Sequence, residues 1–301
     1  MNRAIAAWLT EHPWRPIVAI AFCAALAQVL PPFIMLFACA IPVLTVLRFD
    51  VKLGLAVAAV GAGVQAGIVV SLAPTVMAGT YPGILLAFFS PLALAVLLKR
   101  TGSLNLCFQV AVLAVAMLLA VVDLALTDPI GAWKAPLTEL MNAMQPRGLT
   151  QADRDALVAA FAPSMWGALG ATALAMVFGV LLLGRWWNSL LGSQAGAFGA
   201  EYRRLRLGVV LGVAVTVVFL LAMVTDFALV AWLTWVALVA LTFQGLAAAH
   251  RSRAGGRFKL GWLAAMYVLL IVPVSNIITM FVLASWGFID NWLRPGRPAS
   301  L

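Results

Sequence analysis

The sequence predicts an all-α protein that crosses a membrane several times as a polytopic bundle of transmembrane helices. Seven stretches of 19 to 46 residues contain no Lys, Arg, Asp, Glu or His, and the longest lies between Lys52 and Lys99. A helix needs only about 20 apolar residues to cross the hydrocarbon core of a bilayer. The composition agrees, because 64% of the residues are hydrophobic and 10% are charged. The mean hydropathy is +1.07. The charged fraction is well below that of an ordinary soluble surface.

The first uncharged stretch, from 16 to 47, is too long for one untilted span and short for two. Pro31-Pro32 lies in its middle, and tandem proline ends a helix because it removes backbone donors and clashes with the preceding turn. We therefore expect a hairpin of two short helices, over 17–30 and 33–47. A single span in this stretch is the alternative, and it would place the N-terminus on the outer side.

The remaining uncharged stretches supply seven more spans. The longest stretch is expected to break at Ala73-Pro74 and again around Pro82, since proline ends or kinks a helix. The expected spans after the hairpin cover 53–72, 82–98, 104–126, 164–184, 207–225, 227–249 and 260–284. The total is about nine, with a range of eight to ten, because Pro273 can split the last of them.

The distribution of positive charge predicts the orientation. With the N-terminus in the cytoplasm, the inner side carries fourteen of the 19 Lys and Arg residues and the outer side carries five, which is the bias of the positive-inside rule. The net charge of +9 is therefore assigned to membrane orientation and not to nucleic-acid binding. We expect a multi-pass protein of the bacterial inner membrane with a cytoplasmic N-terminus. If Pro273 splits the last span, Arg294 and Arg297 return to the cytoplasmic side.

A single integral membrane domain, 1–301, is expected to carry two larger extramembrane segments. The outer segment, 128–163, is predicted to form two amphipathic or interfacial helices parted by 145–148. The second of these begins at a capping-box sequence, Thr150-x-x-Asp153. Two roles are open for this insertion, a lid over an outward vestibule or plain packing at the membrane interface.

The inner segment is a cytoplasmic loop, 185–207, in which a flexible tract at 192–196 precedes a basic sequence. Arg203, Arg204 and Arg206 make that sequence a candidate for partner docking. One interpretation is a coupling helix that touches a cytoplasmic partner or anionic lipid headgroups. The other is an anchor that does no more than fix the topology.

The sequence contains no pattern for enzymatic chemistry. It has no GxxxxGK[ST] phosphate loop, no HExxH, no zinc-like Cys/His cluster and no GxSxG nucleophile elbow. Its three cysteines lie in or beside apolar runs without CxxC spacing, which is typical of buried thiols. We therefore expect no enzyme, no metal site and no cofactor. Any ATPase that energises the protein is expected to be a separate chain.

Ionisable groups inside membrane segments are functional candidates, because removing them from water costs free energy. Asp123 lies near the outer end of its predicted span, Thr127 and then Asp128 follow one turn later, and Asp226 lies in an outer turn between two spans. We expect the three carboxylates at the same membrane face, where they would form a cation-attracting or proton-linked vestibule. The alternative is that they are ordinary residues at helix ends.

A second candidate site lies beside Pro273, where Ser275 and Asn276 follow a proline break. A break frees backbone groups at membrane depth, and broken helices of this kind build binding sites in transporters. Other uncharged polar residues, such as Gln244, can line a cavity or bridge two helices. The candidate substrate-binding residues are therefore Asp123, Thr127, Asp226, Ser275 and Asn276.

Small residues recur at a spacing of four, which is the pattern of close helix packing. Gly63-x-x-x-Gly67 and Ala21-x-x-x-Ala25 are two examples.

Longer motifs suggest a family. Residues 198–207 have the sequence FGAEYRRLRL and residues 286–294 have the sequence WGFIDNWLR. Together with the prolines of the first two spans, they resemble the YybS-like family of uncharacterised bacterial membrane proteins over nearly the whole chain.

The chain is also distantly similar to the substrate-binding subunits of energy-coupling-factor vitamin transporters. That similarity implies that an Ala-x-x-x-Ala face on the first helix docks a transmembrane coupling partner, and Ala21 and Ala25 match this face. The chain departs from those subunits in having more spans than their usual six and a long outer insertion.

Two functions follow from these observations. The first is a small-solute transporter or a substrate-binding transporter subunit, and the alternative is a non-transporting membrane scaffold or assembly factor. Polar residues that converge on one interior cavity would favour the transporter. Polar residues that face separate helix contacts would favour the scaffold.

Overall fold

The fold is described by a computed structural model, which covers residues 2–27, 33–72, 77–144, 150–191, 196–256 and 259–293. Within these ranges the regular elements are all helices, so the predicted all-α class is confirmed. The chain divides into two compact units, and neither is continuous in sequence. Unit 1 comprises Met1–Ala111 and Ala175–Leu205, and unit 2 comprises Val112–Leu174 and Arg206–Leu301.

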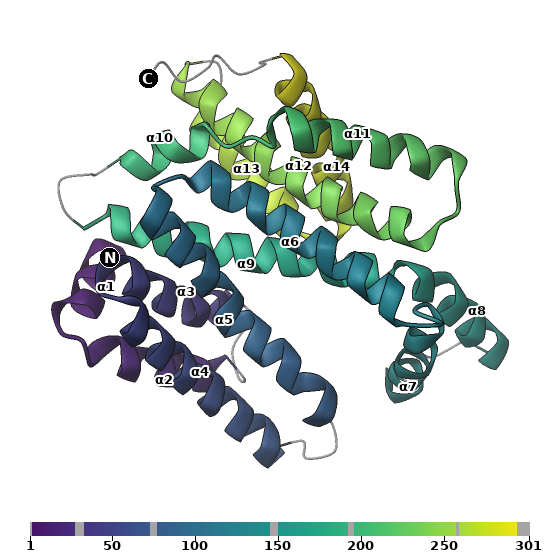
Figure 1. The fold of residues 1–301 in the computed structure, drawn as a ribbon, viewed down its shortest axis with the longest axis horizontal. Coiled ribbons are helices and arrows are strands. Elements are labelled where there is room, and N and C mark those ends of the chain that lie inside the picture. The colour runs from purple at the N-terminus through teal and green to yellow at the C-terminus, as the bar shows by residue number, and fades with distance from the viewer. Residues whose placement is uncertain are drawn as a thin grey trace. The chain divides into compact units, whose positions relative to one another are not determined.

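Unit 1 is a helical bundle with α3 at its centre (Figure 1). Its helices are α1 (Asn2–Glu11), α2 (Arg15–Leu26), α3 (Phe33–Arg48), α4 (Val51–Leu72), α5 (Met77–Thr101), the start of α6 (Leu104–Ala125), the end of α9 (Met165–Ser189) and α10 (Ala197–Arg203). Small residues let helices approach α3 closely. A Cβ on Gly184 of α9 would come within 2.5 Å of the Val43 side chain. The core of unit 1 therefore depends on both of its stretches of chain.

The side chains of Lys99 and Arg185 each hold two helix ends of unit 1 together by hydrogen bonds. The Lys99 ammonium donates to the carbonyl oxygens of Val46 (2.8 Å) and Phe49 (2.7 Å), which lie where α3 ends. These carbonyls have no partner within the helix, and a cation satisfies them well. The half-buried Glu201 carboxylate of α10 accepts two bonds from Arg185 of α9, at 3.0 and 2.5 Å. A bidentate pair of this kind fixes both position and orientation.

Unit 2 is built around α12, which is buried from Val236 to Thr242 without interruption. Its elements are the rest of α6, η2 (Gly131–Trp133), α7 (Lys134–Met144), α8 (Gln151–Phe161), η3 (Ala162–Ser164), the start of α9, α11 (Gly208–Val224), α12 (Ala228–Ala254), α13 (Leu260–Ile271) and α14 (Pro273–Leu293). The backbones of α12 and α14 touch at two glycines. A Cβ on Gly245 would overlap the Leu283 carbonyl oxygen, and a Cβ on Gly287 would overlap the carbonyl oxygen of Leu241.

Several helices are apolar enough for a multi-pass membrane protein, which agrees with the predicted class. Among the described residues, six candidate spans meet the length and hydropathy that a crossing requires: Val51–Ser71, Pro82–Thr101, Leu104–Ala125, Gln151–Ser189, Ala228–Ala254 and Pro273–Leu293. The number is seven if α10 and α11 together form one broken span. The predicted count of nine is not confirmed, because α2, α3 and α13 have 12, 16 and 12 residues. A helix of 12 residues is about 18 Å long, shorter than the hydrocarbon core.

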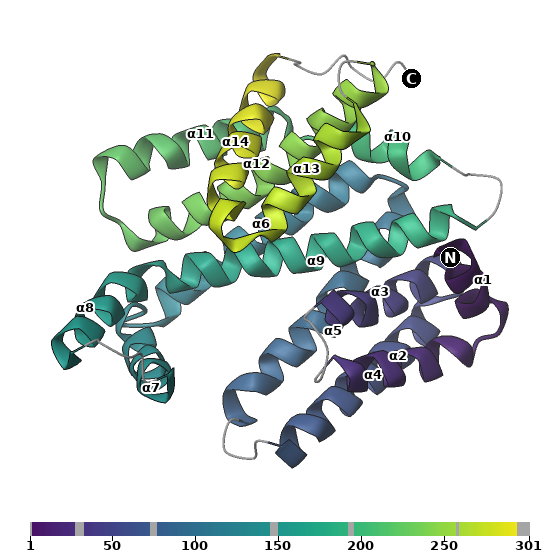
Figure 2. The same cartoon turned by 180° about the vertical axis from the view of Figure 1, so that it is seen from behind.

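Proline acts differently at two predicted breaks. The run over 260–284 is broken at Val272, and α13 and α14 form a V-shaped pair around that residue (Figure 2). The break expected around Pro82 does not occur, since α5 runs from Met77 through this proline. Pro82 lies in the second turn, where it removes a single early backbone bond. The predicted breaks at Pro31-Pro32 and Ala73-Pro74 lie outside the described residues.

The segment 128–163, predicted to be an outer insertion, contains the two expected helices, α7 and α8. Thr150 caps α8 in the predicted way, because its hydroxyl accepts from the Asp153 amide (3.2 Å) while the Asp153 carboxylate accepts from the Thr150 amide (2.9 Å). Tryptophans fasten the segment within unit 2. The Trp166 indole donates to the Pro129 carbonyl (2.8 Å), and the Trp232 indole donates to the carbonyl of Pro163 (2.7 Å). The predicted separation at 145–148 and the tract at 192–195 lie outside the described residues.

Replacing Thr150 with alanine is expected to speed amide hydrogen exchange in the first turn of α8 about fivefold, because an N-cap contributes about 1 kcal/mol to a helix start. Hydrogen exchange of the full-length protein in detergent checks this. Thr138→Ala in α7 is the control, since the Thr138 hydroxyl bonds back to the Lys134 carbonyl (2.8 Å) and caps nothing. Equal effects of the two substitutions would contradict the cap assignment.

Candidate functional site

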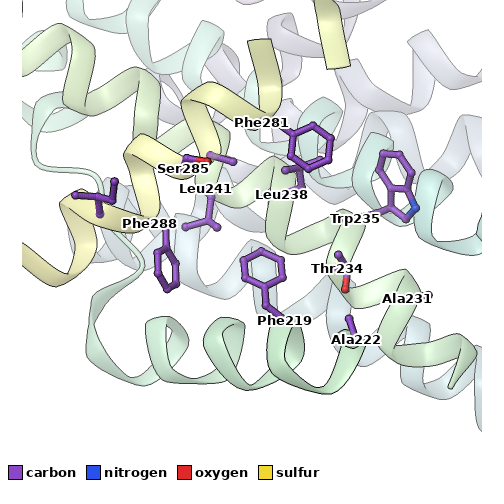
Figure 3. Close-up of a pocket in the computed structure, with 12 residues that line it drawn as sticks. Phe219, Ala222, Ala231, Thr234, Trp235, Leu238, Leu241, Phe281, Ser285 and Phe288 are labelled. Carbon is purple, nitrogen blue, oxygen red and sulfur yellow. The ribbon is translucent and has the colours of Figure 1, made fainter. Parts of the chain in front are cut away.

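Unit 2 contains a cavity of about 660 Å³ between α11, α12 and α14 (Figure 3). It is lined by apolar and aromatic side chains for the most part: Phe219, Ala222, Ala231, Thr234, Trp235, Leu238, Leu241, Phe281, Ala284, Ser285, Phe288 and Ile289. A volume of this size is typical of sites for small molecules, which usually occupy roughly 300–1,000 Å³.

One face of each helix supplies the lining. On α12 the lining positions recur every three or four residues from Ala231 to Leu241, and α14 repeats the same spacing from Phe281 to Phe288. This is the period at which residues share one side of a helix. Phe219 projects from α11 into the space toward the other two helices (Figure 3). Apolar faces of three helices thus line the cavity, which is open on one side.

The cavity offers few polar groups and no charge. None of the twelve side chains drawn in Figure 3 is ionisable. The Thr234 hydroxyl donates to the Val230 carbonyl of its own helix at 2.9 Å, so the hydroxyl proton is not available to a ligand. The Ser285 hydroxyl and the Trp235 indole are the other polar groups of the lining. A ligand in this cavity would therefore be held by apolar contact and aromatic packing.

A buried polar cluster lies one helical turn beyond the cavity, on both α12 and α14. Gln244 is fully buried, and its side-chain oxygen accepts from the Leu207 amide at 2.9 Å. The Asn291 side chain bonds both backbone groups of Gly208, accepting from its amide (3.2 Å) and donating to its carbonyl (3.1 Å). Gln244 and Asn291 also bond each other at 3.3 Å. The cluster therefore holds the chain that enters α11 against α12 and α14.

Glycines make room for this cluster. Gly208 has a φ of +80°, a conformation that an L side chain rarely adopts. On α11, a Cβ at Gly212 would overlap the Asn291 side-chain nitrogen. Arg251 of α12 and Asp290 of α14 also form an ion pair at 2.5 Å. These contacts fix the spacing of the three helices that enclose the cavity.

Ser275 and Asn276 both lie at the break between α13 and α14. The Ser275 hydroxyl donates to the Leu269 carbonyl at 2.9 Å, and the Asn276 side-chain amide donates to the Leu270 carbonyl. These carbonyls belong to the last turn of α13, where the helix supplies no partner. The two side chains thus satisfy the backbone that the break frees, which is a structural use for residues predicted to bind substrate.

The predicted outer carboxylates are all placed in unit 2, near its helix ends. Asp123 is half-buried in the last turn of α6, whereas Thr127 and Asp226 are exposed. The neighbouring Asp128 caps a turn by accepting from the Gly131 amide at 2.7 Å. In the described part of the chain no group of three or more His, Cys, Asp or Glu side chains is arranged to hold a metal ion. A proton-linked or cation-attracting vestibule at Asp123, Asp128 and Asp226 stays a prediction, as does substrate binding by Thr127.

The predicted docking residues lie in two elements. Arg203 is half-buried at the end of α10, Arg204 is exposed beyond it, and Arg206 is half-buried in the segment that follows. On α2, Ala21 is half-buried and Ala25 is exposed. Their docking role remains a prediction.

The sequence did not predict the cavity residues, because an apolar lining has few of the polar and ionisable groups that mark a candidate site. The signal that could have found them is the helical spacing of aromatic and small residues in the last three apolar segments. Comparisons with protein-family models, with curated proteins and with solved structures found no significant match to this chain.

Proposed function

We propose that this protein is a membrane transporter, or the substrate-binding subunit of one, whose solute is an apolar or amphiphilic small molecule bound between α11, α12 and α14. The observation that carries the proposal is the cavity of about 660 Å³ with its aromatic lining. Burying apolar surface contributes roughly 25 cal/mol for each Å² removed from water. A hydrophobic solute therefore gains free energy in this cavity without any charged partner.

The surroundings of the cavity argue against a strongly polar solute. A sugar, an amino acid or an ion would leave its polar groups without partners, which costs roughly 1–3 kcal/mol for each group. Gln244 and Asn291 already bond each other and the backbone before α11. The proposal therefore narrows the small solute expected from the sequence to a hydrophobic class.

Coupling to energy would come from another polypeptide. The sequence carries no GxxxxGK[ST] phosphate loop, so a separate ATPase or coupling subunit is part of the proposal. Ala21 and Ala25 on α2, and the arginines at 203, 204 and 206, are the proposed contacts for such partners. A charge-reversed triple variant that still binds its partner would remove the arginines from this role.

A non-transporting scaffold or assembly factor is the second candidate. It is favoured by the way described polar side chains serve helix contacts: Gln244 and Asn291 join α12, α14 and the start of α11, and Ser275 and Asn276 close the break before α14. Bridging helices is the commoner use of polar residues in membranes. The two candidates differ in whether the cavity carries a ligand.

The proposal is tested by filling the cavity. Ala222→Phe places a ring in the space beside Thr234 (Figure 3), and it is expected to lower the amount of co-purifying apolar solute about tenfold, because the ring occupies the volume that the solute needs. Mass spectrometry of organic extracts of the detergent-purified protein measures this. Ala214→Phe is the control, since Ala214 is an exposed residue of α11 outside the lining.

The outcomes separate the two candidates. A solute present in the wild-type protein and the control, and depleted in Ala222→Phe, supports the binding function. If wild-type protein carries nothing beyond bulk lipid, or the two variants carry equal amounts, the cavity is not a solute site and the scaffold becomes the better account.

A further inference from the structure

Unit 1 has a second cavity, of about 440 Å³, beneath the N-terminal helix α1. Its walls come from α1, α2, α3 and the end of α9, and they include four aromatic side chains: Trp8, Phe22, Phe37 and Trp187. The rings of Phe37 and Trp187 stack at 5.8 Å. The cavity is separate from the proposed solute site, because all of its lining belongs to unit 1.

The helix over this cavity has the character of an interfacial helix. Ala6 and Leu9 are buried, while Ile5 and Trp8 line the cavity and remain exposed in part. Trp14, in the turn after α1, is also exposed. Tryptophan is the residue that favours the region of the lipid headgroups, where one edge of its ring is apolar and the other is wet.

A cation packs against Trp8, one of the aromatic side chains that line the cavity. The Arg15 guanidinium lies 5.4 Å from the centre of the Trp8 ring and 5.7 Å from that of Trp14. Its side chain is only 15% exposed, whereas the paired Glu11 carboxylate is 61% exposed. The Arg15 Nε is buried and has no acceptor among the described residues. A largely buried guanidinium, whose counter-ion is exposed to water, therefore packs against one aromatic wall of the cavity.

The charge of unit 1 favours an anion at this place. Unit 1 contains nine Lys and Arg residues and three Asp and Glu residues, a net charge of +6. They lie in α1, in α10 and at the ends where α2 and α4 begin and α3, α5 and α9 end. A basic cluster at one membrane surface attracts anionic lipid headgroups.

We propose that unit 1 binds one anionic phospholipid, with an acyl chain in the cavity beneath α1 and the phosphate on the Arg15 guanidinium. The aromatic walls fit a hydrocarbon chain, and a phosphate oxygen fits the terminal guanidinium nitrogen that Glu11 now occupies, because guanidinium groups bind phosphate through charge-assisted bonds. The exposed Glu11 can move into water when a phosphate replaces it. This site lies apart from the solute cavity and does not depend on that assignment.

Cys23 provides the probe, because it lines this cavity and is partly exposed, whereas Cys39 and Cys107 are fully buried. The full-length protein is reconstituted either in phosphatidylcholine vesicles or in an equal mixture of phosphatidylcholine and phosphatidylglycerol. The rate of maleimide alkylation is then measured, with Cys23→Ser to show that the signal comes from this thiol. We expect alkylation about fivefold slower in the mixed vesicles.

Matched variants test the role of charge. Arg15→Gln is expected to abolish the difference between the two lipids, and Arg204→Gln, which removes an exposed cation of the same unit, is expected to keep it. Ile5→Glu places a carboxylate at the cavity wall and is expected to abolish the difference as well, whereas Ile5→Gln keeps it. The two Ile5 variants test whether the cavity binds an anionic lipid if Arg15→Gln does not fold. Gel filtration confirms the folded state of each variant.

Two results would overturn the proposal. One is equal alkylation of the wild-type protein in both vesicles, which would show that the cavity does not recognise an anionic headgroup. The other is a lipid difference that survives in folded Arg15→Gln or Ile5→Glu. Ala222→Phe should leave the difference intact, because it changes unit 2 alone, so the failure of one proposal would not be mistaken for failure of the other.

Discussion

Gly245→Ala is expected to lower the free energy of unfolding of unit 2 by at least about 3 kcal/mol, the upper part of the range for overpacked cores. The added methyl group would overlap the Leu283 carbonyl oxygen on α14. A backbone atom cannot rotate away as a side chain does, so the two helices must separate. Gly287→Ala should act similarly, because its methyl group would overlap the carbonyl oxygen of Leu241.

Equilibrium unfolding of the detergent-solubilised protein measures this effect. Gly179→Ala in α9 is the control, because a Cβ there has nothing within 4 Å. Alanine is the better helix former by up to about 1 kcal/mol, so this control should be neutral or slightly stabilising. If Gly245→Ala matched Gly179→Ala, the close crossing of α12 and α14 would be wrong.

Asn291→Leu is expected to destabilise unit 2 by about 2–3 kcal/mol, because it leaves two buried donors without a partner. These donors are the amide of Gly208 and the side-chain nitrogen of Gln244, and the Gly208 carbonyl also loses one of its bonds. We expect the segment before α11 to loosen first, since these bonds hold it. The measurement is the free energy of unfolding, together with hydrogen exchange around Gly208.

Asn142→Leu in α7 is the matched control, since Asn142 is exposed and should change stability by less than about 0.5 kcal/mol. A double-mutant cycle with Gln244→Leu adds a sharper test. The two substitutions should be less destabilising together than their sum, because each removes a partner of the other. Strict additivity would show that the two side chains do not act as one cluster.

The helices themselves could be predicted well from the sequence. Uncharged runs locate apolar helices because burying a charge in hydrocarbon is costly. The number of crossings could not be settled in this way. Apolar composition does not show whether a helix of 12 residues, such as α2 or α13, reaches across a bilayer. Proline is equally ambiguous, because the chain breaks before Pro273 but continues through Pro82.

Close packing shows a different limit of sequence reasoning. The Gly63-x-x-x-Gly67 pattern indicates a contact surface, yet a Cβ at either position has nothing within 4 Å. The closest crossing instead uses Gly245 and Gly287, single glycines on two different helices. A spacing rule describes one helix, whereas a crossing depends on which residues of a second helix meet it.

The candidate site was the hardest part to predict. Ser275 and Asn276 have the chemistry of ligand-binding residues, but the same groups also cap freed carbonyls, and only the local geometry distinguishes the two uses. The cavity between α11, α12 and α14 has the opposite difficulty. Its residues are those of any apolar helix face. The sequence does not show whether three such faces surround a cavity or face the lipid.

The interrupted sequence of unit 1 has a consequence for its biosynthesis. A ribosome that has released residues up to Ala111 has made α1 to α5 but not the end of α9. That end of α9 contributes Phe178, Gly184 and Trp187. They contact Phe108, Val43 and Phe37 of the earlier helices, in that order. These contacts and the Arg185–Glu201 pair cannot form until residues 112–174 of unit 2, and then the end of α9 and α10, have been synthesised. The nascent N-terminal helices therefore pass through an incomplete state in which a membrane chaperone or insertase could hold them, and release would be timed by the arrival of α9 and α10.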